Sequence, residues 1–215
     1  MRRFLLLLLP LVLPGCGSML PESWVPDLSS LWEAPPPEAE PDPPGLPAAR
    51  APVDGTPALR LSWGKGSAMA LLVSQNGERR LWRSTGGVVV ATDGARVTAT
   101  AGLREWIAGT RLDGPDPLDE PLELLAQPAS LRRQVDFMRN DRSPARMRFG
   151  VALSCQLSAA RQGPVVLVRE ACRGGGSGGF TNRYWADPAS GGIYRSEQWV
   201  GEIGTMRLEV VTPPS

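Results

Sequence analysis

The stretch MALLVSQNGERRLWR, residues 69–83, has the pattern of a β-hairpin. The apolar run from Met69 to Ser74 predicts a strand, and Asn76-Gly77 is a turn sequence that matches the twist of two antiparallel strands. Residues Arg79 to Arg83 then predict the returning strand. Short strands beside tight turns recur from Ala58 onward, and this repetition decides the fold class.

Further strands are predicted on both sides of this hairpin. Leu59–Trp63 and Arg96–Thr100 alternate with the period of two that a half-buried strand requires. The remaining predicted strands are Val88–Thr92, Arg132–Met138, Arg146–Leu157, Pro164–Ala171, Phe180–Asp187, Ile193–Val200 and Thr205–Val211. Helix signals are nearly absent. The prediction is a mainly β fold with little helix, an antiparallel β-barrel-like or sandwich domain.

One segment of the predicted domain departs from this pattern. Residues 104–125 contain Pro115, Pro117 and Pro121, and proline cannot donate a hydrogen bond to a neighbouring strand. We expect a loop there, with at most a helical turn.

Composition excludes several classes of function. The net charge is +1 and the arginines are spread among acids, which argues against a nucleic-acid partner. The chain has no histidine, and Lys65 is its only lysine. Histidine-based triads, histidine metal sites and the usual general base near neutral pH are therefore ruled out. We expect a protein that is not an enzyme and that needs no cofactor or metal.

The N-terminus has the features of a lipoprotein signal peptide. Met1-Arg2-Arg3 is a positive start, and Phe4–Leu13 is an apolar run too short to span a bilayer. Leu13-Pro14-Gly15-Cys16 resembles a bacterial lipobox, in which the cysteine is acylated and becomes the first mature residue. We predict lipid attachment at Cys16, with residues 1–15 removed. Gly17, in place of an aspartate, favours the outer membrane on its periplasmic side.

Residues 16–57 are predicted to connect this anchor to the β domain, residues 58–215. The segment Glu33–Pro57 is rich in proline, which favours extended polyproline geometry and a semi-stiff tether. Before it, residues 23–32 contain Trp24 and Trp32. This short amphipathic patch would either rest on a lipid or protein surface or stay unstructured.

The C-terminal hairpin, Phe180–Val200, can be paired residue by residue. Pairing Asp187 with Ile193 predicts the pairs Arg183–Glu197 and Trp185–Arg195 on one face, and Tyr184–Ser196 and Asn182–Gln198 on the other. One face then offers an ion pair and a cation–π contact, and the other offers amide and hydroxyl groups. Two interpretations remain open: a surface that contacts carbohydrate, or a polar network that fixes the strand register.

Parts of this hairpin also resemble a known family. Asn182–Trp185, Gly192-Ile193 and Ser196–Gln198, with Val90–Leu103 and the lipobox, resemble the YjbF/GfcB lipoproteins of exopolysaccharide and group 4 capsule operons. The resemblance implies a β-barrel-like (YmcC-like) fold and a role in polysaccharide production or export, without known catalytic residues. The long proline-rich tether and the second and third cysteines depart from that pattern.

Cys155 and Cys172 are predicted to form a disulfide. After acylation of Cys16 they are the two remaining cysteines in a compartment that oxidises thiols. Their strands meet at Gly163-Pro164, and counting outward places Ala160 opposite Leu167 and Cys155 opposite Cys172. Two buried free thiols are the alternative.

Three other motifs carry weaker signals. Gly64–Ser67 lacks the upstream glycine of a phosphate loop and predicts a turn. The glycine-rich run 173–179 has the composition of either an anion cradle or a mobile loop. A group of carboxylates between residues 113 and 120 offers oxygen ligands for Ca²⁺, but its spacing fits no EF-hand and a solvent-exposed loop is the alternative.

These observations favour an outer-membrane lipoprotein that acts as a non-enzymatic accessory factor in exopolysaccharide or capsule export. Its expected partners are membrane lipid, through Cys16, a polysaccharide-export or outer-membrane protein, and polysaccharide itself. Two alternatives remain: a polysaccharide-binding or carboxylate-based modifying protein, which needs two carboxylates ~5–9 Å apart, and a structural envelope lipoprotein that supports an outer-membrane partner.

Overall fold

Antiparallel strands make up most of the computed structural model, which describes residues 55–214 except 142 and 177. The strands are β1 (Ala58–Trp63), β2 (Gly66–Asn76), β3 (Arg79–Ser84), β4 (Val89–Asp93), β5 (Arg96–Ala101), β6 (Glu105–Asp113), β7 (Ala129–Arg139), β8 (Arg148–Gln162), β9 (Val165–Gly174), β10 (Phe180–Ala186), β11 (Ile193–Trp199) and β12 (Thr205–Thr212). Two single 3₁₀ turns, η3 (Glu123–Leu125) and η4 (Pro144–Arg146), are the helical elements of this part of the chain. No helix within it is long and apolar enough to cross a membrane.

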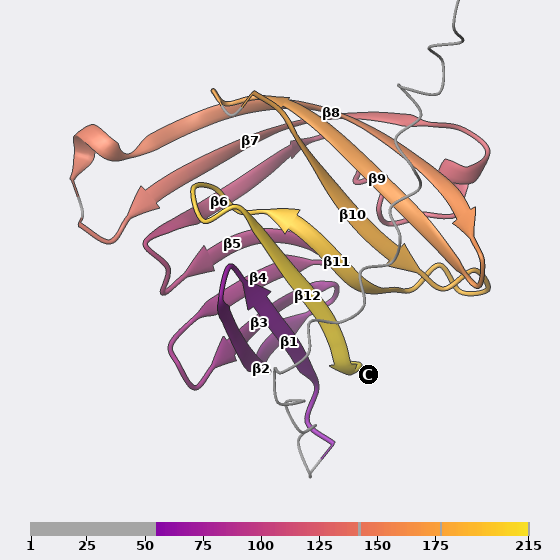
Figure 1. Cartoon of the computed structure of the whole chain (residues 1–215), viewed down its shortest axis with the longest axis horizontal. Coiled ribbons are helices and arrows are strands. Elements are labelled where there is room, and N and C mark those ends of the chain that lie inside the picture. The colour runs from indigo at the N-terminus through magenta and orange to yellow at the C-terminus, as the bar shows by residue number, and fades with distance from the viewer. Residues whose placement is uncertain (1–54, 142, 177, 215) are drawn as a thin grey trace, which may run out of the picture. The chain divides into compact units, whose positions relative to one another are not determined.

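The strands form one sheet in the order β5-β4-β3-β2-β1-β12-β11-β10-β9-β8-β7-β6. Each strand pairs with its neighbours in sequence, except that β1 pairs with β12 in the middle of the sheet and no ladder joins β5 to β6. The two edges lie side by side, and the Ile107 backbone N–H donates to Thr100 Oγ1 across them at 3.0 Å. The sheet therefore curls into a nearly closed antiparallel barrel (Figure 1).

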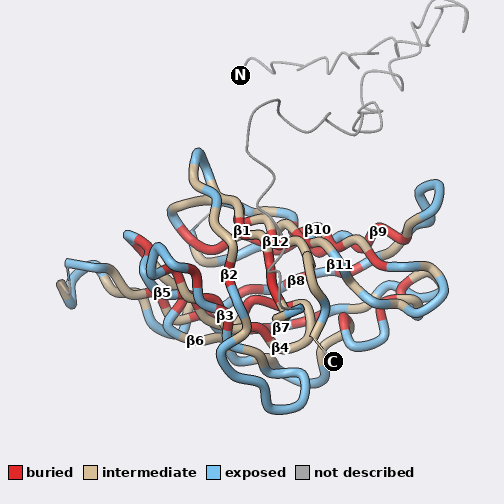
Figure 2. Tube along the Cα trace, turned by 90° about the horizontal axis from the view of Figure 1, so that it is seen from below, coloured by how far each residue is buried: buried red, intermediate tan, exposed pale blue. Residues whose placement is uncertain are grey.

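Alternation along the strands separates an inner from an outer face. On β1, Leu59 and Leu61 are buried, and they face Ala70 and Ala68 of β2 and Leu208 of β12. Buried positions line the enclosed side of the sheet, whereas exposed positions gather in the hairpin turns (Figure 2). The period-two pattern in the sequence thus reports which side chains fill the barrel.

The predicted hairpins are present. The hairpin of residues 69–83 is formed by β2 and β3, with Asn76 paired to Arg79 and Gly77 at φ +59° in the turn. In the C-terminal hairpin, Arg183 pairs with Glu197 and Trp185 with Arg195, as predicted. Gly64 and Lys65 form the turn between β1 and β2, and the glycine-rich run 173–179 begins with the last two residues of β9 and continues toward β10.

Two predictions were wrong in detail. Residues 105–113, expected in a loop, form the nine-residue strand β6, whereas the expected helical turn is η3. A bulge between Ile107 and Gly109 breaks the alternation of β6 and conceals it in the sequence. In the C-terminal hairpin Ile193 faces Ala186 rather than Asp187, because a bulge inserts one residue between these pairs and Trp185–Arg195.

The disulfide is present between Cys155 and Cys172, whose Cα atoms are 4.0 Å apart. Its register is the predicted one, with Ala160 opposite Leu167. The β domain was expected to begin at residue 58, which is the first residue of β1. Cys16, Trp24, Trp32 and all but the last residues of the tether lie outside the described residues, so the predictions for them remain predictions.

Candidate functional site

A network of charged and polar side chains lies inside the barrel. Its centre is Glu170 on β9, which is completely buried, as is Arg96 at the start of β5. Arg96 Nη1 donates to Glu170 Oε1 at 2.8 Å, and Arg133 Nη2 of β7 lies 3.8 Å from Glu170 Oε2. We call this set the inner network; its members are Arg96, Asp116, Arg133, Glu170, Asn182, Tyr184 and Gln198.

The predicted hairpin residues complete the shell around Glu170. Asn182 Nδ2 donates to Glu170 Oε2 at 2.6 Å, and the Tyr184 hydroxyl donates to the same oxygen at 3.1 Å. The Asn182 amide oxygen in turn accepts the backbone N–H of Trp199 at 2.8 Å. Glu170 therefore has a charged or polar partner on each oxygen, as a buried carboxylate requires.

Gln198 ties β11 to the hairpin between β4 and β5. Its Oε1 accepts the backbone N–H of Val97 at 3.0 Å, and its Nε2 donates to the carbonyl of Ala95 at 2.8 Å and to Ser196 Oγ at 2.9 Å. Ala95 and Val97 lie about a hundred positions from Gln198 in sequence. The hydrogen bonds fix the β4–β5 turn against the opposite side of the barrel.

The surroundings of Glu170 set its protonation. Burial alone would raise the pKa of its carboxyl group, but Arg96, Arg133 and the Asn182 amide outweigh burial and hold the pKa below its ordinary value. Burial and the nearby Glu170 charge raise the pKa of the Tyr184 hydroxyl. Glu170 thus stays ionised and Tyr184 neutral across the physiological range.

Asp116 extends the inner network into the loop between β6 and β7. Arg96 Nε and Nη2 donate to its two carboxylate oxygens at 2.5 and 2.9 Å, and the backbone N–H of Leu118 donates to Oδ1 at 3.0 Å. A bidentate pair of this kind fixes both position and angle. Asp116 therefore holds its loop onto the barrel, and both of its oxygens are bonded to Arg96.

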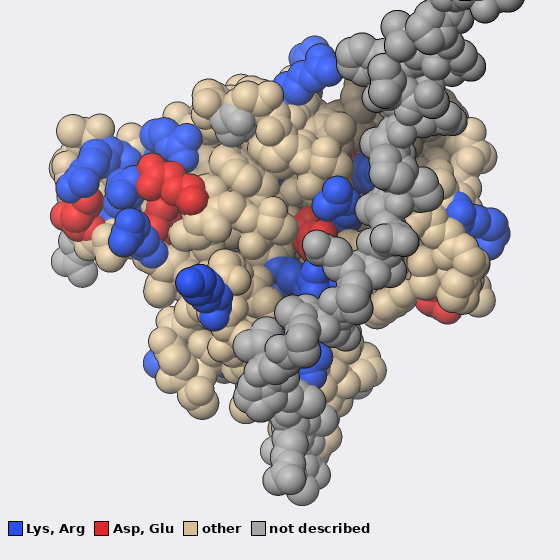
Figure 3. Space-filling model, in the orientation of Figure 1, with Lys and Arg blue, Asp and Glu red and all other residues tan. Residues whose placement is uncertain are grey.

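The outer face of β1 and β10–β12 carries an outer belt, whose members are Arg60, Arg183, Arg195, Glu197, Arg207 and Glu209. Glu197 accepts from Arg207 at 2.8 Å and from Arg183 at 3.4 Å, and Arg195 lies over the Trp185 ring at 4.7 Å. The predicted ion pair and cation–π contact are both present. Acidic and basic side chains lie next to one another over β10–β12 (Figure 3).

The seven hairpin residues singled out from the sequence therefore divide between two places. Asn182, Tyr184 and Gln198 point inward and bond to other buried groups, whereas Arg183, Trp185, Arg195 and Glu197 belong to the outer face. The inward three have the arrangement of a network that fixes register. Contact of the outward four with carbohydrate remains a prediction.

Sequence reasoning missed the charged half of the inner network. Glu170 and Arg133 occupy inward positions of strands whose other inward residues are apolar or cysteine, such as Val168 and Val135. The sequence signal for both is a charged residue at one of the alternate strand positions that are otherwise apolar. Glu170 also lies beside the sulfurs of Cys155 and Cys172, but both sulfurs belong to the disulfide and are not free thiolates.

Comparisons with known proteins agree with this architecture. The crystal structure of the hypothetical lipoprotein YmcC from Escherichia coli (K12) matches with a TM-score of 0.63 and 18% sequence identity, covering 74% of this chain and 88% of that chain. At this identity the likeness shows the fold alone. A search of curated protein sequences found no significant match. The family model described as "Group 4 capsule polysaccharide lipoprotein gfcB, YjbF" matches residues 49–211, which confirms the resemblance found in the sequence. The chain therefore belongs to the YjbF family of group 4 capsule polysaccharide lipoproteins.

Proposed function

We propose that the protein is a non-enzymatic accessory factor in the production or export of a surface polysaccharide. Family membership supplies the link to capsule polysaccharide. The finer assignment, an accessory rather than a catalytic role, rests on the chemistry of the barrel interior.

The observation that carries the proposal is that the buried polar groups of the inner network bond to one another. Glu170 is held ionised by two arginines, and Tyr184 is held neutral by burial and by Glu170. A general acid or base must instead exchange protons near its working pH. The histidine-free sequence offers no other group with an ordinary pKa in that range. The protonation states of Glu170 and Tyr184 therefore favour a structural role, in which the barrel is a scaffold whose surface binds partners.

The proposed place of action is the periplasmic face of the outer membrane. The lipobox ending at Cys16 supports a lipid anchor, and Gly17 supports sorting to the outer membrane. The proline-rich segment before residue 58 would set the distance between membrane and barrel. The proposed partner is a polysaccharide-export or outer-membrane protein.

A gene deletion in the producing bacterium tests the proposal. Loss of the protein should lower the amount of surface polysaccharide while the composition and linkages of its repeat unit stay unchanged. Complementation with wild-type protein should restore the amount. Polymer that lacks a substituent, or has altered linkages, would show instead that the protein modifies polysaccharide. Normal amounts of normal polymer would contradict both roles.

A further inference from the structure

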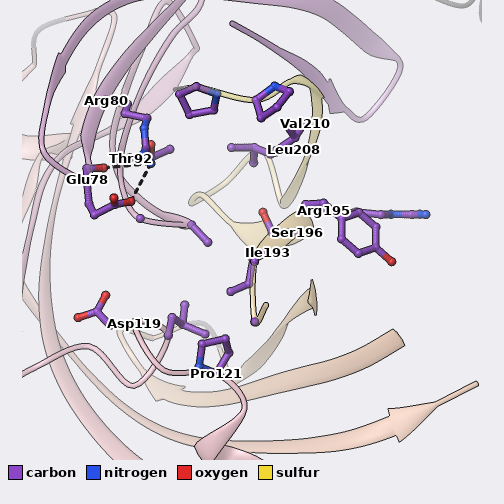
Figure 4. A pocket seen from close by; sticks show the side chains of 18 of the residues that line it. Glu78, Arg80, Thr92, Asp119, Pro121, Ile193, Arg195, Ser196, Leu208 and Val210 are labelled. Carbon is purple, nitrogen blue, oxygen red and sulfur yellow. Dashed lines mark hydrogen bonds and ion pairs between the residues drawn. The ribbon is translucent and has the colours of Figure 1, made fainter. Parts of the chain in front are cut away.

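A cavity of about 690 Å³ lies at one end of the barrel. Its lining comes from the β2–β3, β4–β5 and β10–β11 turns, the β6–β7 loop and the C-terminal end of β12. We call it the mouth cavity (Figure 4). Its volume falls within the range of small-ligand sites.

The inner wall of the mouth cavity is apolar. Leu59, Trp82, Ile193, Leu208 and Val210 contribute to it, and Ile193, Leu208 and Val210 project toward the open space in Figure 4. The indole N–H of Trp82 donates to Thr92 Oγ1 at 3.2 Å, which fixes the ring. This wall is suited to the C–H face of a ring-shaped ligand.

The rim of the cavity is acidic. Glu78, Asp119 and Glu120 line it, and all three side chains are exposed. Arg80 also lines it, but Glu78 neutralises its charge at 3.0 Å. The Arg195 guanidinium is directed to the outer face, over Trp185. Two carboxylates of the rim, Asp119 and Glu120, therefore have no arginine of the cavity as a partner.

Two further observations describe the hydrogen-bonding capacity of the rim. Partial burial and the neighbouring carboxylates of Asp116 and Asp93 raise the pKa of Asp119, so this group gains from an added hydrogen-bond donor. Arg80 Nε has no acceptor among the described residues, but it is buried below the cavity surface and a ligand cannot reach it. The rim thus offers a ligand hydrogen-bond acceptors, the carboxylates of Asp119 and Glu120.

The inner network holds the walls of the mouth cavity in place. The Arg96–Asp116 pair fixes the loop that carries Asp119, and Gln198 fixes the turn that carries Ala95. Both restraints are hydrogen bonds within the chain itself, so the walls need no contact with a ligand to hold them. Preformed walls lower the entropy lost when a ligand binds.

From these features we propose that the mouth cavity binds a short segment of carbohydrate that is uncharged or carries an amino group. The ring face would pack on the apolar wall while hydroxyl or ammonium groups donate to the rim carboxylates. A uronic acid would place its own carboxylate against Asp119 and Glu120 and would be disfavoured. The inference rests on the proposed function, because family membership is what makes polysaccharide available to this protein.

Calorimetric titration of the full mature protein in detergent tests the inference. The probes are oligosaccharides of two to six residues, released by mild acid from the surface polysaccharide of the producing bacterium. Ion exchange separates them into neutral, amino-bearing and acidic fractions. We expect a neutral or amino-bearing fraction to bind and the acidic fraction to bind at least about tenfold more weakly.

Paired variants locate the site. Asp119→Asn should weaken binding by about tenfold, since the charged acceptor becomes a neutral amide, whereas Asp113→Asn, an exposed change outside the lining, should leave affinity unchanged. Ile193→Trp should place an indole ring over the apolar wall and block binding there, and the control Val73→Trp places the same side chain at an exposed position of β2. Thermal unfolding checks that each variant folds; Asp119 is exposed, so that variant tests the site even if Ile193→Trp does not fold.

Tightest binding by the acidic fraction, no binding by any fraction at millimolar concentration, or binding that survives Asp119→Asn would overturn the carbohydrate site. Failure of the broader proposal is separate from this, because it is read from polymer amounts in the deletion strain. If export is normal in the deletion strain but the protein binds carbohydrate, the accessory role is wrong and the carbohydrate site stands. If export is impaired but no carbohydrate binds, the carbohydrate site is wrong and the accessory role stands.

Discussion

Replacing Glu170 with glutamine removes the carboxylate that Arg96 and Arg133 share. Arg96 keeps its two bonds to Asp116, but Arg133 has no other carboxylate within ion-pair distance among the described residues. Arg133 is buried, so its charge would be left without compensation. Breaking a buried pair in this way costs about 3–5 kcal/mol, which corresponds to a fall of roughly 10 °C in melting temperature for a domain of this size.

The loss should depend on pH with a defined sign. The pKa of Glu170 is lower in the folded protein than its ordinary value of 4.5. Its contribution to stability is therefore fully present above pH 4.5 and disappears as the pH falls through the lower folded-state pKa. The difference between wild type and Glu170→Gln should be large at pH 7 and should shrink below pH 4.5.

Urea unfolding followed by tryptophan fluorescence measures both effects. Glu123→Gln, an exposed change on η3, is the matched control and should alter stability by less than about 0.5 kcal/mol. Adding Arg133→Met to Glu170→Gln should recover part of the loss, because the uncompensated charge is then absent. A loss below about 1 kcal/mol, or a difference that is equal at pH 7 and pH 3, would refute the assignment of Glu170 as the centre of the network.

Four further predictions concern other parts of the chain. Replacing Cys155 and Cys172 by alanines should cost about 3 kcal/mol in urea unfolding, and denatured, unreduced protein from the periplasm should have no thiol that reacts with an alkylating agent. Changing Cys16 to serine should move the protein from the membrane pellet to the soluble periplasmic fraction; an unchanged pellet and no acyl mass on wild type would contradict the anchor. Deleting residues 35–52 should leave the melting temperature within a few degrees of wild type, because an extended proline-rich segment makes few packed contacts. Glu197→Gln, which breaks partly exposed ion pairs of the outer belt, should cost no more than about 1 kcal/mol in the same urea assay, and a larger loss would show that the belt carries the fold.

The sequence predicted those features that depend on neighbouring residues along the chain. Tight turns fixed the registers near Gly77 and Gly163, and the second of these placed Cys155 opposite Cys172. The pairing of Arg183 with Glu197 was also predicted correctly, although the pair nearest the turn of that hairpin, Asp187 with Ile193, was wrong because the bulge lies between the two pairs. A short hairpin leaves few alternative registers, because a slip of one residue moves every side chain to the wrong face.

Features that depend on distant segments could not be predicted. Strand β6 contains a bulge. Its first residue, Glu105, is buried, and its carboxylate accepts hydrogen bonds from Arg148 and from the backbone N–H of Glu202. The partners of Glu170 come from β5, β7 and β10, and no local pattern specifies which strands meet inside a closed barrel. The mouth cavity likewise combines several turns that are separated widely in sequence.

The pairing of β1 with β12 has a consequence for how the protein is made. Arg60 and Glu209, which face each other in this ladder, are 149 positions apart. During synthesis β1 is made before all the other strands, and its second edge stays uncovered until β12, the last strand, is made. Contacts of such long sequence separation slow folding. Until β12 pairs with β1, the sheet formed by β1–β5 has an unpaired edge at β1. Unpaired strand edges can pair with other chains. Completion of the barrel depends on the final eight-residue strand, so a chain that ends early keeps that edge open.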